Sequence, residues 1–265
     1  MGFLSHRVKR SDLEAGDHIY TWRTPIFAYS HHGIYIGGDK VVHFTQHQNL
    51  SSGDSTSFRF SSSVTDVTAD CLDFPDCGFR KHTSGVVMSC LNCFLGDGSL
   101  YRFEYGVSPV VLITRLRSGT CTTAKSDPPE EVIHRAMHLL QHGFGKYDVF
   151  SNNCEDFALY CKTELVVCPR RGSGGSGQVS SVVGVPVATI LSLPLKMFVS
   201  NPVVLGATAV VNYNLNRYAS DVGVRDDVVK VEVEGVAAFH GNLTAGVDGG
   251  ADVAGDRPKK RRRNS

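Results

Sequence analysis

The sequence lacks the extremes of composition that distinguish disordered and fibrous chains from ordinary globular proteins. Charged residues make up 20% of its 265 residues and hydrophobic residues 42%, so disorder, collagen and coiled coil do not describe the whole chain. We find no internal repeat. The first ten residues, MGFLSHRVKR, lack the apolar stretch of a secretory signal. We therefore expect a globular protein with a sizeable core, located in the reducing cytoplasm.

Positive charge is scarce outside the C-terminal tail. Six of the 27 lysines and arginines lie between Arg257 and Arg263, which leaves 21 basic residues against 26 acidic ones. An acidic body is a poor surface for nucleic acid, because binding to phosphates needs a basic face. We therefore predict no nucleic-acid partner. The basic tail has three interpretations, which are a nuclear-import signal, a tether to an anionic membrane and a solvated end.

Cysteine is moderately frequent, and in a reducing compartment its expected roles are thiol, metal ligand and catalyst. Four of the eight cysteines, Cys71, Cys77, Cys90 and Cys93, lie close together in the sequence. Cys90 and Cys93 have the two-residue spacing of half a zinc site, whereas five residues separate Cys71 from Cys77. Two interpretations stay open, a structural zinc site and four unliganded thiols. We predict no other cofactor.

Alternating β-branched and aromatic residues predict strands in two parts of the chain. The first part covers residues 17–46 and has the turn sequence Gly37-Gly38-Asp39, and the second covers residues 100–116. Residues 49–63 are rich in serine and predict an exposed loop. Together these patterns predict a β-rich first half.

Two helices are predicted in the following region. The first begins with Asp127 as its cap and ends at Gly143, with an apolar face of Ile133, Met137 and Leu140. Three histidines, His134, His138 and His142, repeat on another face, where metal binding and a solvated polar face both fit and the second is favoured. The second helix begins near Asn152 or Asn153, and we expect Cys161 and Cys168 to be buried thiols.

Charge is almost absent from residues 172–216, where Lys196 is the single charged residue. Pro186, Pro194 and Pro202 interrupt the apolar runs on either side of it, so we expect no regular membrane-spanning helix. Residues 179–211 are predicted either to lie at a membrane interface or to pack as buried helices.

Two histidines, His31 and His43, are predicted to converge on one face of the first hairpin. If Gly37 to Asp39 form a three-residue loop, Ile34 points to one face and the two histidines point to the other as diagonal neighbours. His32 then points away from them, with Ile34. A two-residue turn would break this alternation, so the choice of His31 over His32 depends on the loop.

Cys154 has the sequence context of an activated nucleophile. Two asparagines precede it, and an asparagine cap places the thiol in the first turn of a helix, where free N–H groups favour the thiolate. A nearby histidine can take the proton, and a second polar group can orient the imidazole. The competing interpretation is that Cys154 is a small buried residue and the histidines are polar strand residues.

These residues resemble the lecithin:retinol acyltransferase family, also called the NC domain, and above all its plant members. The likeness covers residues 1 to about 230 and rests on three motifs, which are His31-His32-Gly33-Ile34-Tyr35-Ile36-Gly37, Val42-His43-Phe44 and Asn153-Cys154-Glu155. In the family pattern one histidine stands three residues before an Ile-Tyr pair, a second follows it twelve residues later, and the nucleophile lies in an Asn-Cys-Glu motif. His31, His43 and Cys154 hold these places.

The resemblance implies an α+β fold, in which an antiparallel sheet packs against the cysteine-bearing helix in a circularly permuted papain-like arrangement. It implies acyl transfer from a phospholipid through an acyl-thioester on Cys154, with His31 as general base and His43 orienting it. The implied partner is a phospholipid or a membrane surface, while protein partners stay open. Two positions depart from the animal members, because Asp156 replaces their usual histidine and His32 a frequent aromatic residue.

The implied activity is that of an acyltransferase or a phospholipase-type hydrolase. The alternatives are a catalytically silent scaffold with a regulatory role and, less favoured, a thiol peptidase. We divide the chain into a catalytic domain over residues 1–170 with an insertion at about 49–100, an apolar segment over 171–220, and an extension over 221–265 that ends in a disordered basic tail.

Overall fold

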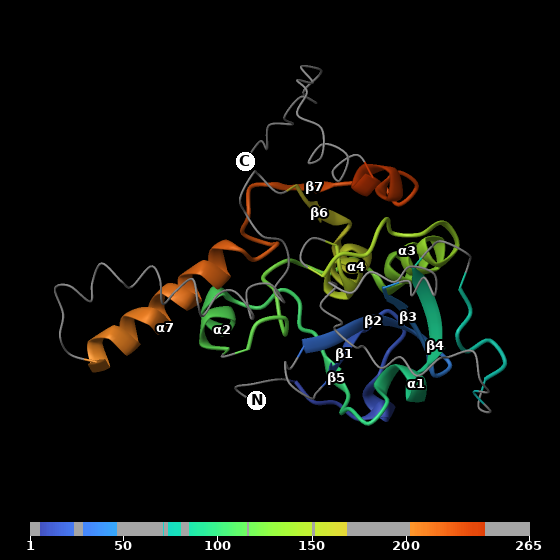
Figure 1. Cartoon of the computed structure of the whole chain (residues 1–265), viewed down its shortest axis with the longest axis horizontal. Coiled ribbons are helices and arrows are strands. Elements are labelled where there is room, and N and C mark those ends of the chain that lie inside the picture. Colours follow the sequence, from blue (N-terminus) through green and yellow to red (C-terminus); the bar gives the residue numbers. More distant parts are fainter. Residues whose placement is uncertain are drawn as a thin grey trace, which may run out of the picture.

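The centre of the fold is a five-stranded antiparallel sheet with the strand order β4-β3-β2-β1-β5 (Figure 1). The computed structural model describes residues 6–23, 29–46, 71, 74–80, 85–115, 117–149, 152–168 and 202–241. A short 3₁₀ turn, η1 (Arg10–Asp12), precedes the strands β1 (His18–Arg23), β2 (Tyr29–Gly37), β3 (Lys40–Phe44), β4 (Val86–Cys90) and β5 (Tyr101–Arg102). The protein is therefore a mixed α+β protein with an antiparallel sheet, as the sequence predicts.

Helices cover both faces of this sheet. In Figure 1, α3 (Pro129–His142) and α4 (Cys154–Thr163) lie above it, and α1 (Leu91–Leu95) lies below. Ile34 and Val42 belong to the larger apolar cluster, which they share with Phe157 of α4. Val41 belongs to a second cluster with Phe94 of α1. Successive residues of β3 thus face different helices, as the alternation of a strand requires.

The turn between β2 and β3 is shorter than predicted. Gly38 and Asp39, each with a φ of 57°, form a two-residue turn, and Gly37 already pairs with β3. Positive φ at both central positions is the reason that glycine and aspartate suit such a turn. A bulge before Gly37 adds one residue back to β2, so Ile34 still pairs with Val42. The prediction of the loop is wrong, yet the alternation on which the histidine argument depends is retained.

The second predicted β-rich region is mostly not a strand. Among the described residues of this region only β5 is a strand, and Pro109–Thr114 form the helix α2. The Ser108 side chain accepts a hydrogen bond from the Val111 N–H, and Pro109 occupies the first turn. These are helix-start signals, and they prevail over the β-branched residues that follow.

Helix α3 ends at Gly143 as predicted, but it begins later, and the predicted apolar face is right only in part: Leu140 is in the core and Met137 packs against it. Asp127 does not cap it, because its carboxylate pairs with Arg135, at 2.8 Å. Arg135 also donates to the Cys161 carbonyl of α4, at 2.9 Å, and so points inward. The buried stripe contains Val132, Ala136, Leu139 and Leu140, whereas the predicted Ile133 and Met137 are half-buried.

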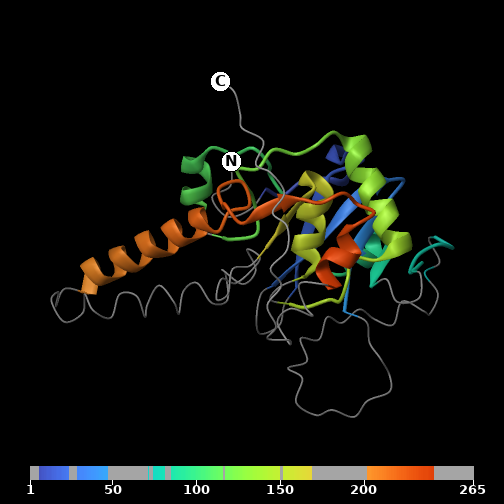
Figure 2. The same cartoon turned by 90° about the horizontal axis from the view of Figure 1, so that it is seen from above.

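The C-terminal part packs back against elements from earlier in the chain. Helix α7 (Pro202–Ala219) extends away from the sheet beside α2 (Figures 1 and 2). After it, β7 (Val228–Lys230) pairs antiparallel with β6 (Leu165–Val167), and a short helix covers residues 236–241. Val233 and Val236 join the larger apolar cluster. Residues 221–241 therefore contribute to the core.

Among the described residues, no helix has both the length and the apolar character that crossing a membrane requires. Three predictions lie outside the described residues. They are the serine-rich loop at 49–63, the first part of the apolar segment at 179–201, and the basic tail.

Candidate active site

His31 and His43 meet on neighbouring strands. The His31 Nε2 atom lies 3.0 Å from the His43 Nδ1 atom, and the two rings are nearly perpendicular. The His43 Nε2 atom lies 2.9 Å from the Ser89 hydroxyl of β4. All three side chains are buried. Three adjacent strands thus form one chain of polar groups, from Ser89 through His43 to His31.

The Phe94 ring of α1 covers this histidine pair. Its centre lies 5.2 Å from that of His31 and 5.4 Å from that of His43. Gly33 makes this approach possible, because a Cβ atom there would stand 3.0 Å from the Phe94 ring and 2.7 Å from Val41. Phe94 therefore excludes water from the imidazoles. Sequence reasoning missed both Ser89 and Phe94, since nothing local shows that β4 pairs with β3.

Burial keeps both imidazoles neutral. It lowers the pKa of His43 to about 3, and it lowers that of His31 well below its ordinary value, with His43 as the next cause. A general base must be unprotonated before it acts. If His31 donates its Nε2–H to His43, and His43 donates its Nε2–H to Ser89, the Nδ1 atom of His31 is left as a proton acceptor.

Cys154 is the first residue of α4, and the predicted cap is present. The Asn153 side chain accepts hydrogen bonds from the N–H groups of Glu155 and Asp156, at 2.8 and 3.3 Å. The thiol is buried, and it donates to the Ser30 carbonyl, with Sγ and O 3.8 Å apart. The side chain of Tyr147 is hydrogen-bonded to it.

Cys154 and the histidine pair both border the first residues of β2. The pair packs on Phe94 of α1, whereas α4, which Cys154 begins, packs against the other face of the sheet through Phe157. Ser30, whose carbonyl contacts Cys154, directly precedes His31 in the strand. The structure therefore brings His31 and His43 together and places Cys154 against the backbone next to His31.

His32 belongs to a second buried network, on the face opposite His31. Its Nδ1 atom lies 2.8 Å from His18 Nε2, and its Nε2 atom lies 2.7 Å from the Ser30 hydroxyl. The Tyr105 hydroxyl lies 2.7 Å from the remaining His18 nitrogen. Burial lowers the pKa of His32 to about 3. His18 and Tyr105 were missed by sequence reasoning, since residues so far apart in the chain meet only through the sheet.

Asp156 has a capping role. Its carboxylate accepts a hydrogen bond from the Asn153 N–H, at 3.0 Å, which completes a capping box. Burial raises its pKa to about 6. Asp156 therefore helps to fix the helix end that carries Cys154.

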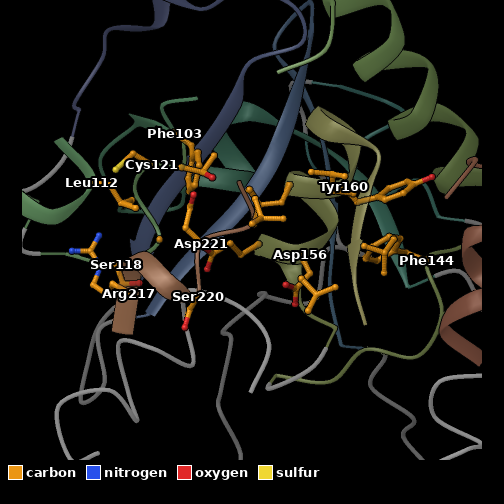
Figure 3. Close-up of a pocket in the computed structure, with 18 of the residues that line it drawn as sticks. Phe103, Leu112, Ser118, Cys121, Phe144, Asp156, Tyr160, Arg217, Ser220 and Asp221 are labelled. Carbon is orange, nitrogen blue, oxygen red and sulfur yellow. The ribbon is translucent and has the colours of Figure 1, made fainter. Parts of the chain in front are cut away.

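A pocket lies on another side of α4 (Figure 3). Asp156 and Tyr160 of α4 line one part of it, and Arg217, Ser220 and Asp221 line another. The described residues that line this pocket do not include the two candidate histidines or the candidate cysteine. It is thus a separate feature from the candidate active site.

The other candidate residues have different surroundings. The four clustered cysteines have Sγ atoms that all lie within 4.8 Å of one another. Cys161 is fully buried as predicted, whereas Cys168 is only half-buried, so that prediction is wrong. On α3, His134 and His142 are exposed and His138 is half-buried.

The chain is similar in sequence to known proteins of one family. The model of the lecithin retinol acyltransferase family matches residues 11–167. The chain is 50% identical to Protein LEAD-SENSITIVE 1 of Arabidopsis thaliana over 235 residues, which are 88% of this chain and 90% of that protein. It is 26% identical to human lecithin retinol acyltransferase over 160 residues, 60% of this chain and 59% of that protein. No solved structure matches it. The chain therefore belongs to the lecithin retinol acyltransferase family.

Proposed function

We propose that this protein is a thiol-dependent acyltransferase or phospholipase-type enzyme that takes an acyl group from a phospholipid onto Cys154. The observation that carries the proposal is the chain from Ser89 through His43 to His31, which ends beside the backbone carbonyl that Cys154 contacts. The family match supports acyl transfer, because the human relative is named an acyltransferase of lecithin and retinol. The buried, neutral imidazoles suit a general base.

The proposed reaction assigns each of these residues a step. His31 accepts the thiol proton at Nδ1 while His43 holds its ring, and the Cys154 sulfur attacks the ester carbonyl of the phospholipid. The ester C–O bond then breaks, and the departing lysophospholipid oxygen takes the proton from the His31 imidazolium. An alcohol in a transferase, or water in a hydrolase, then attacks the acyl-thioester while His31 accepts its proton. The thioester C–S bond breaks, and the departing Cys154 sulfur takes the proton back from His31.

The order of the elements supports a circularly permuted papain-like fold. In papain-like proteases the catalytic cysteine precedes the histidine in the chain. Here the histidine strands β2 and β3 come first and the cysteine helix α4 follows. The same partners, a helix N-terminus and a sheet, are thus joined in the reverse order.

A phospholipid surface is the proposed partner, and α2 and α7 supply the apolar side chains for it. Val211 and Leu215 of α7 are 53% and 56% exposed, and Val110 of α2 is 69% exposed. The two helices are in contact. Exposed apolar residues on adjacent helices are typical of a surface that binds a membrane interface. Such binding would place a cytoplasmic protein at its lipid substrate.

The second candidate function is a catalytically silent scaffold. The observation that favours it is the burial of Cys154, whose thiol contacts the Ser30 carbonyl and Tyr147. In a scaffold this packing would persist, and phospholipid would not reach the sulfur.

Intact-protein mass spectrometry after incubation with phosphatidylcholine vesicles separates the two functions. We expect the mass of one acyl chain to appear on the protein and to be absent from Cys154→Ser. The matched control, Cys168→Ser, should keep it. His31→Ala should slow acylation on the order of a hundredfold or more, as loss of a general base does, and His32→Gln should not. If neither an adduct nor lysophospholipid forms, the enzyme proposal fails and the scaffold stands.

A further inference from the structure

The four clustered cysteines have the geometry of a tetrahedral metal site. The Sγ atoms of Cys71, Cys77, Cys90 and Cys93 all lie within 4.8 Å of one another. Cys71 lies 3.6 Å from Cys90 and 3.8 Å from Cys93, measured between sulfurs. A zinc ion that binds four thiolates at about 2.3 Å places its sulfurs about 3.8 Å apart. A disulfide needs about 2.05 Å, so these separations correspond to free sulfurs arranged around a point.

Backbone N–H groups point at two of these sulfurs. The Cys90 N–H donates to the Cys77 sulfur at 3.2 Å, and the Cys93 N–H donates to the Cys90 sulfur at 3.3 Å. Thiols are weak hydrogen-bond acceptors, whereas thiolates accept well because they are charged. Donors of this kind stabilise the ligand charge around a bound cation. They are an observation independent of the sulfur distances, and they favour the same occupant.

Contacts that need no metal hold the two halves of the cluster together. The Gly78 N–H donates to the Met88 carbonyl at 2.8 Å, and the Met88 N–H donates to the Phe79 carbonyl at 2.9 Å. Lys40 of β3 pairs with Asp76 at 3.2 Å. The segment at residues 74–80 is thus docked on β4. This docking brings Cys77 to the two cysteines at the end of that strand.

We propose that Cys71, Cys77, Cys90 and Cys93 bind one structural zinc ion. Four protein ligands close the coordination shell, and a closed tetrahedral shell is characteristic of structural zinc. Each cysteine binds as a thiolate, so each thiol that binds releases its proton to solvent, and no oxidant or reductant takes part. The assignment rests on the cysteine geometry alone and not on the proposed acyl transfer.

The zinc ion also stabilises the surroundings of the histidine pair. Cys90 ends β4 directly after Ser89, which is hydrogen-bonded to His43. Cys93 directly precedes Phe94, whose ring packs on both histidines. The metal therefore fixes the junction of β4 and α1 from which both contacts are made. Its loss should loosen that junction before it affects α3 and α4.

Metal analysis of the full-length protein tests the site. We expect elemental analysis to find about one zinc per chain after purification without chelators. Cys77→Ser and Cys93→Ser should lose most of it, whereas the control Cys168→Ser should keep it. Cobalt added to metal-free protein should give the ligand-field absorption of a tetrahedral thiolate site. Native protein that contains no zinc and whose four clustered thiols react with Ellman's reagent would overturn the proposal, and so would stoichiometric iron in place of zinc.

Hydrogen exchange on the wild-type chain keeps the proposal testable if a variant does not fold. A strong chelator should remove the zinc and lower the protection of the amides of β4 and α1, while those of α3 and α4 stay protected. Equal protection with and without chelator would refute the effect on the junction. Zinc content is measured without substrate, so it is independent of the acylation experiment. Zinc without an acyl adduct would overturn only the proposed enzyme activity. An acyl adduct on a zinc-free protein would overturn only the proposed metal site.

Discussion

Lowering the pH from about 7.5 to about 5.5 should destabilise this protein strongly, because five of the described histidines are buried as neutral rings. One of them is His240, whose pKa burial lowers to about 4. Burial lowers the pKa of His32 and His43 to about 3, and it lowers the pKa of His18 and His31 well below 6.5. In the unfolded chain each ring titrates near its ordinary pKa, about 6.5. As the pH falls through that value the unfolded state binds more protons than the folded state, so stability is lost.

The size of the loss follows from the number of rings. Each histidine that stays neutral in the folded state lowers the free energy of unfolding by about 1.4 kcal/mol over this interval, and the five of them by about 7 kcal/mol. Asp156 acts in the opposite direction. Burial raises its pKa to about 6, so the folded state takes up this proton first and regains about 1 kcal/mol. The net loss of about 6 kcal/mol is a large part of the roughly 5 to 15 kcal/mol typical of a domain.

Urea unfolding at the two pH values measures this loss. Trp22, the one tryptophan, reports on β1 by its fluorescence, since its ring lies 4.6 Å from the Arg117 guanidinium. In the His32→Gln variant, the decrease in the free energy of unfolding between the two pH values should be smaller by about 1.4 kcal/mol. This difference is expected even if the variant is less stable than the wild type at both pH values. His134→Gln, on the exposed face of α3, should leave the loss unchanged. Equal stability of the wild type at both pH values would refute the argument from buried neutral rings.

Three other substitutions address the helix cap, the histidine cover and the apolar surface. Asn153→Ala removes the cap of α4, so urea unfolding should show that the free energy of unfolding falls by about 1 kcal/mol. Iodoacetamide should also label Cys154 more slowly, and unchanged labelling would argue against activation of the thiol by the helix end. Gly33→Ala places a methyl group 3.0 Å from the Phe94 ring, so unfolding should become easier by about 1 to 3 kcal/mol, and a stable variant would show that the ring has room to move. Val211→Lys should reduce flotation of the full chain with anionic vesicles, and undiminished flotation would exclude this part of α7 from the lipid contact.

Local signals predicted the parts of the fold that depend on neighbours in the chain. The alternation at residues 17–46 predicted β1 to β3, and the asparagines before Cys154 predicted the start of α4. The histidine face was right although the loop was wrong, because the bulge before Gly37 offsets the shorter turn. Neither a bulge nor a two-residue turn is distinguishable from a three-residue loop by the residue types Gly-Gly-Asp alone.

Long-range contacts account for what the sequence did not predict. Ser89 reaches His43 only because β4 pairs with β3 after an intervening segment of about forty residues, and Phe94 follows from the same pairing. Arg135 is buried on α3 through its bonds to Asp127 and to the Cys161 carbonyl, which the apolar pattern of one helix does not reveal. A single sequence records the periodicity of a helix but not which polar residue finds a buried partner.

The C-terminal region shows how such contacts also decide which experiment is informative. A truncation after Gly172 would seem to isolate the apolar segment, but it would also remove β7, which pairs with β6, and the buried Val233 and Val236. Loss of those core residues would expose apolar surface on the remaining domain. Such a fragment could then bind vesicles through its unfolded core, or fail to bind because it has aggregated. Replacing one exposed apolar residue of α7 by a charged one leaves the core intact. Such a substitution therefore tests membrane binding, which the truncation cannot do.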